Sequence, residues 1–269
     1  MKPPVSLGVL RGVLKDVQAS GRVEKPLVVG GARELAAVLR KELGRDGVRG
    51  AVRESDDVEG ATVLVYVLGH EPSEEDERAL KRARHFRVPI VAVAAGAMPD
   101  VEIPFVLATD VVHVQAGEGF PVETIARAIA ARLGEDGAPL AARLPLLRRA
   151  VCEWIVASCA RKNAIVAVAV FVPGADLPIL ARNQVRMLLR LDQAYGLKLD
   201  PRERAPEVLA VVGAGLGLRT VARELLDLVP VAGWAVKGGV AYAGTRALGE
   251  AAIRRLEAGV PGGHGARRS

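Results

Sequence analysis

The chain has 269 residues, half of them hydrophobic, so it can bury a core, and this composition excludes a disordered protein. Its formal charge of +6 permits an anionic partner, but aromatic residues make up only 3%, which argues against recognition of single-stranded nucleic acid by base stacking. Cys152 and Cys159 are two helical turns apart, roughly 10 Å along a helix, which predicts free thiols and a reducing compartment.

The first 24 residues predict an amphipathic segment. Leu7, Leu10, Leu14 and Val17 recur at helical spacing. Charged residues and prolines interrupt the stretch, so it does not resemble the apolar run of a secretory signal.

Residues 25–134 predict an α/β domain. Strands are expected where apolar residues run together, and amphipathic helices between them. The expected strands are 26–30, 48–55, 61–69, 88–96 and 110–117, and helices are expected at 32–43, after Ser73 and at 121–133. Continuous apolar strands separated by helices indicate a mostly parallel sheet covered on both faces, a three-layer fold.

Ser73 and Asp76 predict a capping box at the start of the helix that follows the strand at 61–69. Glu74, Glu75 and Glu77 lie in the same first turn, where the helix dipole favours negative charge. We therefore prefer a structural interpretation of these carboxylates to a catalytic one.

The pair Gly30 and Gly31 raises the question of a phosphate site, because glycines between a strand and a helix often hold one. A P-loop also requires a lysine followed by serine or threonine, and neither follows here. Glu34 places a negative charge where the phosphate would sit. An atypical nucleotide site would use Gly30, Gly31, Arg33 and Asp57, and this is the alternative to a site without nucleotide chemistry.

The order of elements over residues 25–134 resembles an Era-like GTPase domain. The strand at 89–94 runs into "AAGA", where that family has its guanine-reading Asn-Lys-x-Asp motif, and the later base loop keeps only Ala116. Asp57 and Gly60 match the family's Asp-x-x-Gly motif in letters. The resemblance implies a GTPase-like or flavodoxin-like α/β domain whose nucleotide chemistry is lost.

The composition of residues 135–147 predicts a linker, followed by an all-α domain at 148–258 and a disordered tail at 259–269. Helices are expected at 146–161, 179–195, 205–230 and 233–259.

The segment "FVPGADLPILARNQVRMLLRLDQAYG" (171–196) resembles the signature of the YcjF-like helical domain, a family of unestablished activity. Residues 228–233 and 241–249 are similar to its later motifs, so the resemblance covers about residues 148–252. The matching residues of the first segment are Pro173, Gly174, Ala175, Asp176, Gln184, Arg186, Met187, Tyr195 and Gly196. The resemblance implies a bacterial protein linked to the inner face of the cell membrane.

Small residues recur every four positions in the last expected helix, at Ala235, Gly239 and Ala243. Gly213 and Gly217 offer a second such face. Helices with these faces pack closely in membranes and in soluble bundles alike, so both settings stay open. The apolar runs are interrupted before they reach the length of a membrane span.

Arg182, Arg186 and Arg190 follow one another at four-residue intervals on the helix at 179–195. Such a row binds lipid phosphates or an acidic partner, and the alternative is a solvated face with local salt bridges.

The sequence therefore predicts a non-enzymatic bacterial protein without a cofactor or a metal, since its histidines lack metal-ligand spacing and no nucleophile has a base. A degenerate GTPase-like interaction module would be tethered to a helical domain that oligomerises or associates with a membrane. The expected partners are a second copy, another protein or an anionic membrane surface, and no specific nucleic acid is expected. The expected location is the cytoplasm, and the inner face of the cell membrane stays open as the site of action. The alternative is a nucleotide-binding switch with an atypical phosphate loop.

Overall fold

The computed structural model describes residues 7–21, 24–55, 57–96, 102–115, 117–169, 177–197 and 233–259. The chain divides into two compact units, which are described separately below. An α/β unit comprises residues 20–154, and a helical unit comprises residues 1–19 and 155–269.

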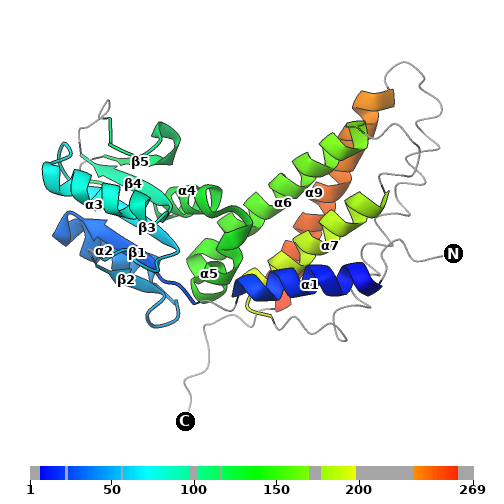
Figure 1. Cartoon of the computed structure of the whole chain (residues 1–269), viewed down its shortest axis with the longest axis horizontal. Helices are drawn as coiled ribbons and strands as arrows, with labels where there is room; N and C mark the ends of the chain where they lie inside the picture. The colour runs from blue at the N-terminus through cyan, green and yellow to red at the C-terminus, as the bar shows by residue number, and fades with distance from the viewer. Residues whose placement is uncertain are drawn as a thin grey trace, which may run out of the picture. The chain divides into compact units, whose positions relative to one another are not determined.

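The α/β unit contains a five-stranded parallel sheet with the strand order β2-β1-β3-β4-β5 (Figure 1). This confirms the predicted parallel sheet, and its order is the one found in flavodoxin-like doubly wound folds. The strands are β1 (Leu27–Gly31), β2 (Val52–Glu54), β3 (Val63–Leu68), β4 (Ile90–Ala95) and β5 (Val111–Val114).

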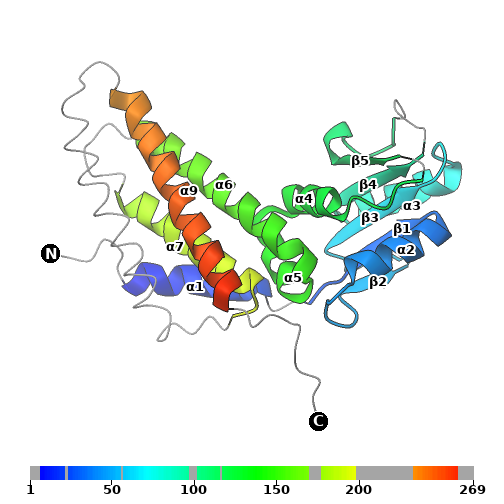
Figure 2. The ribbon, with the colours of Figure 1, turned by 180° about the vertical axis from the view of Figure 1, so that it is seen from behind.

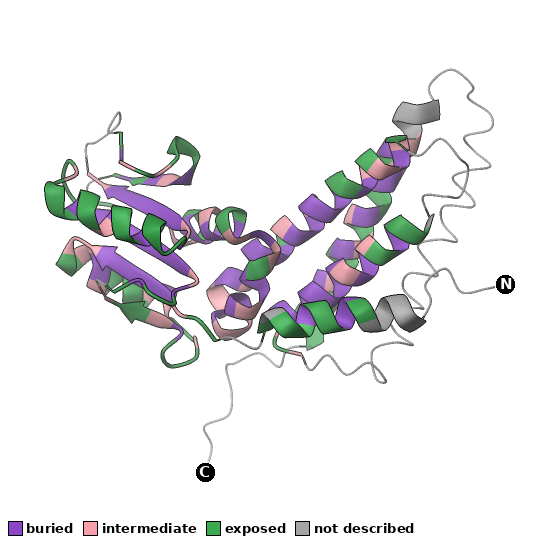
Figure 3. Cartoon of the chain, in the orientation of Figure 1, coloured by how far each residue is buried: buried purple, intermediate pink, exposed green. Residues whose placement is uncertain are grey.

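Helices cover both faces of this sheet. The connection from β1 to β2 runs toward one edge of the sheet, whereas the connection from β3 to β4 runs toward the other edge. Because both connections are right-handed crossovers, their helices α2 (Arg33–Leu43) and α3 (Glu74–His85) lie on opposite faces of the sheet. α4 (Val122–Leu133) packs against β4 and β5. All six residues of β3 are buried, as expected for a central strand with two covered faces (Figure 3).

The core on the α3 face depends on the alternation of side chains along the strands. Leu64, Tyr66 and Leu68 of β3 pack with Leu80 and Ala83 of α3 in one cluster of buried residues. A 3₁₀ turn, η1 (Ala108–Asp110), leads into β5.

The segment predicted as a linker is helical. It contains a 3₁₀ turn, η2 (Gly134–Gly137), then α5 (Ala138–Arg143) and the start of α6 (Pro145–Ala169). The glycine and proline residues of this segment, which suggested a linker, lie instead at helix boundaries. Gly137 directly precedes α5, and Pro145 begins α6. Leu140 is buried, so this segment contributes to the core.

The helical unit contains α1 (Leu7–Gly21), the part of α6 after Trp154, α7 (Leu177–Ala194) and α9 (Gly233–Gly259). α1 is the amphipathic helix that the leucine spacing predicted, and it buries Leu14 and Val17. Figure 2 shows α9 running beside α6 and α7. Within the described ranges, no helix combines the length and the apolar composition needed to cross a membrane.

Candidate functional site

The turn from β1 to α2 is too short to surround a phosphate. Only Ala32 separates the strand from the helix, and its N–H donates a hydrogen bond to the carbonyl oxygen of Val67 at 2.8 Å. Gly31 has φ +99°, and a Cβ atom at this position would overlap the same carbonyl oxygen. Gly31 is therefore required for the close approach of β1 to β3.

The four residues of the alternative nucleotide site have separate surroundings. Gly30 is buried beside the ring of Tyr66, and Arg33 is exposed at the start of α2. The carboxylate of Asp57 accepts the N–H of Glu59 at 2.9 Å, within its own loop. The observed contacts thus give Gly30, Gly31 and Asp57 local structural roles, whereas Arg33 extends into solvent.

Next to this turn, Tyr66 joins the predicted capping box at the start of α3. Its hydroxyl donates to Oδ1 of Asp76 at 2.8 Å, while the hydroxyl and N–H of Ser73 donate to Oδ2 at 2.6 and 2.8 Å. Burial opposes the ionisation of Asp76, but these hydrogen bonds and the charge of His70 outweigh it and lower the pKa of the carboxyl group.

The capping box confirms the prediction for Ser73 and Asp76. The contribution of Tyr66 was missed, although a tyrosine in an apolar strand is itself a signal, because a buried hydroxyl needs a partner. The group is fully engaged in fastening α3 to β3, and this favours a structural role.

A hollow of about 590 Å³ lies at the carboxyl ends of β4 and β5. It is lined by Leu35, Val38, Glu42, Ala95, Gly96, Val114, Gln115, Gly117, Glu118, Gly119 and Phe120. The described residues that line it include two carboxylates and no lysine or arginine. This chemistry suits an apolar or cationic group and disfavours a nucleotide phosphate.

In the helical unit, the row of arginines turns from solvent into the core. Arg182 is exposed, Arg186 is half-buried and Arg190 is 3% exposed. Arg190 donates to Oε1 of Gln193 at 2.9 Å, and Nε2 of Gln193 donates to the carbonyl oxygen of Val17 in α1 at 3.0 Å. Steps of four residues rotate by about 40° each around a helix, so such a row does not stay on one face.

The predicted small-residue face of α9, where it is described, is not the face that packs against α6 within the chain. Gly239 and Ala243 are exposed, whereas Gly238 and Gly249 are buried. A Cβ atom at Gly238 would lie 2.8 Å from Val168 of α6. The close approach of α9 to α6 therefore uses a neighbouring set of small residues. The side chain of Ala235, and all of Gly213 and Gly217, lie outside the described residues.

A buried polar network joins three helices of this unit. Nδ2 of Asn163 in α6 donates to Oγ1 of Thr245 in α9 at 3.0 Å, and Nδ2 of Asn183 in α7 donates to Oδ1 of Asn163 at 2.9 Å. This network was not predicted from the sequence. Its signal was an asparagine within an apolar helix, which needs hydrogen-bond partners when it is buried.

Among the described residues, no group of histidines, cysteines and carboxylates is arranged to hold a metal ion. Comparisons of the chain with protein family models, curated proteins and solved structures found no match.

Proposed function

We propose that the chain is a non-enzymatic bacterial interaction protein. Its α/β unit, a GTPase-like domain without nucleotide chemistry, binds a partner, and its helical unit associates with itself or with the inner face of the cell membrane. The observation that carries this proposal is the one-residue turn at Ala32, whose N–H is already bonded to Val67. A phosphate site at such a turn needs several free N–H groups.

The charges around the sheet support the same proposal. The hollow beside β4 and β5 carries Glu42 and Glu118, and Glu34 lies in the first turn of α2. A triphosphate would meet these carboxylates without the lysine and the hydroxyl that hold the phosphates and magnesium in a P-loop.

Calorimetry tests the absence of nucleotide chemistry. The full chain is titrated with GTP and with ATP, each with magnesium, and we expect no heat of binding. A dissociation constant in the micromolar range, lost in the variant R33A, would establish the alternative, a nucleotide switch with an atypical phosphate loop.

Two measurements test the role of the helical unit. Light scattering after gel filtration gives the number of subunits, and cell fractionation with a salt wash shows whether the protein sediments with membranes. We expect a self-associated species, a membrane-bound fraction that salt releases, or both. A monomer found wholly in the cytoplasmic fraction contradicts this part of the proposal.

A further inference from the structure

The end of α3 and the loop before β5 expose large apolar side chains next to cations. Phe86 and Phe105 are each 43% exposed, and Leu107 is 60% exposed. We name this surface the Arg–Phe patch. It consists of Lys81, Arg82, Arg84, Phe86, Arg87, Phe105 and Leu107.

The fold holds these apolar side chains outward. In the loop before β5, Ile103 is 4% exposed and Val106 packs against the core on the α3 face of the sheet. Phe105 lies between these two residues and Leu107 follows them, and both side chains are exposed to solvent. Phe105 has φ +65°. A bulky residue rarely adopts this left-handed conformation, and strained residues of this kind gather at functional sites.

The backbone is also left-handed at Arg87, which has φ +56° and directly follows Phe86. The described residues include three non-glycine positions with positive φ, and two of them belong to the patch. The guanidinium of Arg84 lies over the ring of Phe105, 5.6 Å from its centroid, and so joins the helix to the loop. This contact places the exposed ring of Phe105 beside the last turn of α3.

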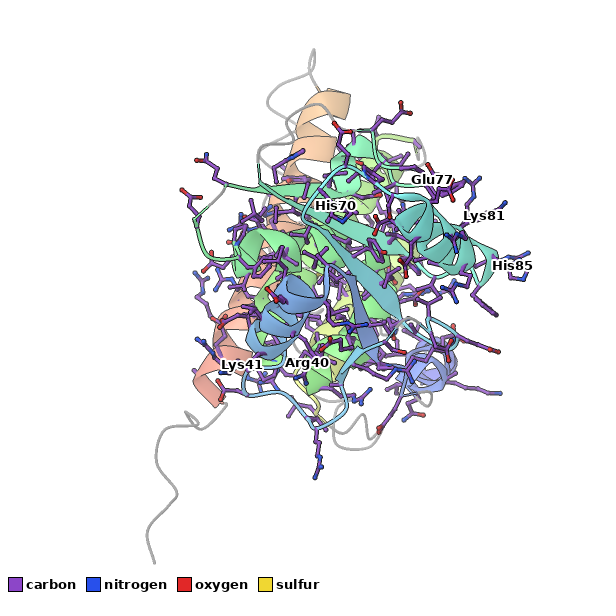
Figure 4. The ribbon with its side chains drawn as sticks, turned by 90° about the vertical axis from the view of Figure 1, so that its left-hand side faces the viewer. Arg40, Lys41, His70, Glu77, Lys81 and His85 are labelled. Atoms are coloured by element: carbon purple, nitrogen blue, oxygen red, sulfur yellow. The ribbon has the colours of Figure 1, made fainter. Side chains whose placement is uncertain are left out.

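The cations of the patch are available to a partner. None of the ion pairs between described residues involves Lys81, Arg82, Arg84 or Arg87. In Figure 4 the side chain of Lys81 points away from the sheet, along the same side of α3 as His85. Cations in the last turn of a helix also offset its dipole, but this does not account for the exposed phenylalanines.

We propose that the Arg–Phe patch binds an acidic segment of a partner protein that also carries apolar side chains. Arginine and aromatic residues are enriched in the centres of protein interfaces, and the guanidinium group matches a carboxylate in two parallel hydrogen bonds. The ordered placement of Phe105 reduces the entropy lost on binding a protein, whereas a fluid lipid surface gains less from it. A second copy of the chain would bring the same cations. The assignment rests on the proposed role of the α/β unit as an interaction module and names its partner's chemistry.

The probe for this proposal is a random copolymer of glutamate and tyrosine, whose binding to the full chain is followed by fluorescence anisotropy. In R82Q/R84Q the affinity falls by about tenfold or more, as expected when charged contacts at an interface centre are lost. In F86A/L107A it falls by at least about fivefold, and polyglutamate binds less tightly than the copolymer.

Two control variants match these changes. R40Q/K41Q removes the same charge from the last turn of α2 (Figure 4), and V38A/V48A truncates two exposed apolar side chains elsewhere in the unit. Both keep the affinity within about twofold, because they lie outside the interface centre. All the altered side chains are exposed, so thermal unfolding is expected to show that every variant is folded.

Four outcomes of the measurements on the purified protein overturn the proposal. They are absence of copolymer binding, equal losses in R82Q/R84Q and R40Q/K41Q, a dimer that dissociates in R82Q/R84Q, and stronger binding of phosphatidylglycerol vesicles than of the copolymer through the same residues. A phenylalanine analogue that forms photo-crosslinks, placed at position 105, tests the proposal in cells. Its cross-linked peptide must be acidic, and a neutral or basic peptide also overturns the proposal. Nucleotide calorimetry is unaffected by these results, so failure of this assignment is distinguishable from failure of the proposed function.

Discussion

Replacing Gly31 with alanine tests the interpretation of the glycine pair directly. The residue has φ +99°, and its added Cβ atom would overlap the carbonyl oxygen of Val67 and lie 2.9 Å from the carbonyl carbon of that residue. The left-handed conformation alone costs alanine about 1 kcal/mol. Because the overlap is with backbone, no rotamer change relieves it, and β1 must move away from β3. We expect a total loss of about 3 kcal/mol or more in the free energy of unfolding.

Gly30 provides the matched control. An alanine Cβ at this position would lie 3.4 Å from the ring of Tyr66, at ordinary contact distance, and the backbone is not left-handed. The expected loss for G30A is therefore below about 1 kcal/mol. If both glycines served to let a phosphate approach the backbone, both substitutions would weaken ligand binding. A large difference between their effects on stability would then not be expected.

The assay is thermal unfolding followed by tryptophan fluorescence in a W234F background, where Trp154 of the α/β unit remains as the reporter. For a unit of this size, a loss of 3 kcal/mol lowers Tm by about 10 °C. The melting temperature of G30A should stay within about 3 °C of the parent. If G31A has the same Tm as G30A, the steric argument is refuted. The glycine pair would then be better explained by the alternative, an atypical nucleotide site.

Three further predictions concern other parts of the structure. Because hydrogen bonding lowers the pKa of Asp76 below its usual value of 3.8, its carboxylate stabilises the fold above that pH, and the contribution disappears as the pH falls through the lowered value. Urea unfolding between pH 2 and 7 should therefore show a shallower acid decline in D76N, and an unchanged decline contradicts this. In G249A the added Cβ atom would overlap Val156, and we expect the free energy of unfolding to fall by about 1–3 kcal/mol. The second change V156A should restore part of this loss, and additive losses measured by urea unfolding would contradict the observed packing. F105N replaces a phenylalanine in the left-handed conformation with a residue that adopts this conformation more readily, so its Tm should equal or exceed that of the parent. A fall of more than about 2 kcal/mol in the free energy of unfolding would show that the ring supports the core.

Local patterns in the sequence predict the elements of the α/β unit but not their order in space. The apolar runs that became β3 and β4 are buried along almost their whole length, so composition alone identifies them. The strand order depends on pairing between distant segments, such as Leu27 with both Val52 and Val63, and no local pattern encodes that pairing. The same limit applies to Gly31, whose necessity arises from Val67, far along the chain.

In the helical unit, the sequence predicts helices but not which face of each helix is buried. α9 offers two sets of small residues, Gly239 with Ala243 and Gly238 with Gly249, and the sequence alone does not show which set is buried. The structure buries the second set together with Thr245, which has no exposed surface.

Thr245 provides the physical reason for that choice. Its hydroxyl donates to the carbonyl oxygen of Ala241 at 2.8 Å and accepts from Asn163 of α6 at 3.0 Å. Rotating α9 to bury Gly239 and Ala243 would separate Thr245 from Asn163, and Nδ2 of the buried Asn163 would lose its hydroxyl acceptor, at a cost of about 1–3 kcal/mol. Polar groups that are satisfied in only one arrangement thus select one helix face from two that are similar in size. The small residues allow α9 to approach α6, and the polar pair fixes which side it presents.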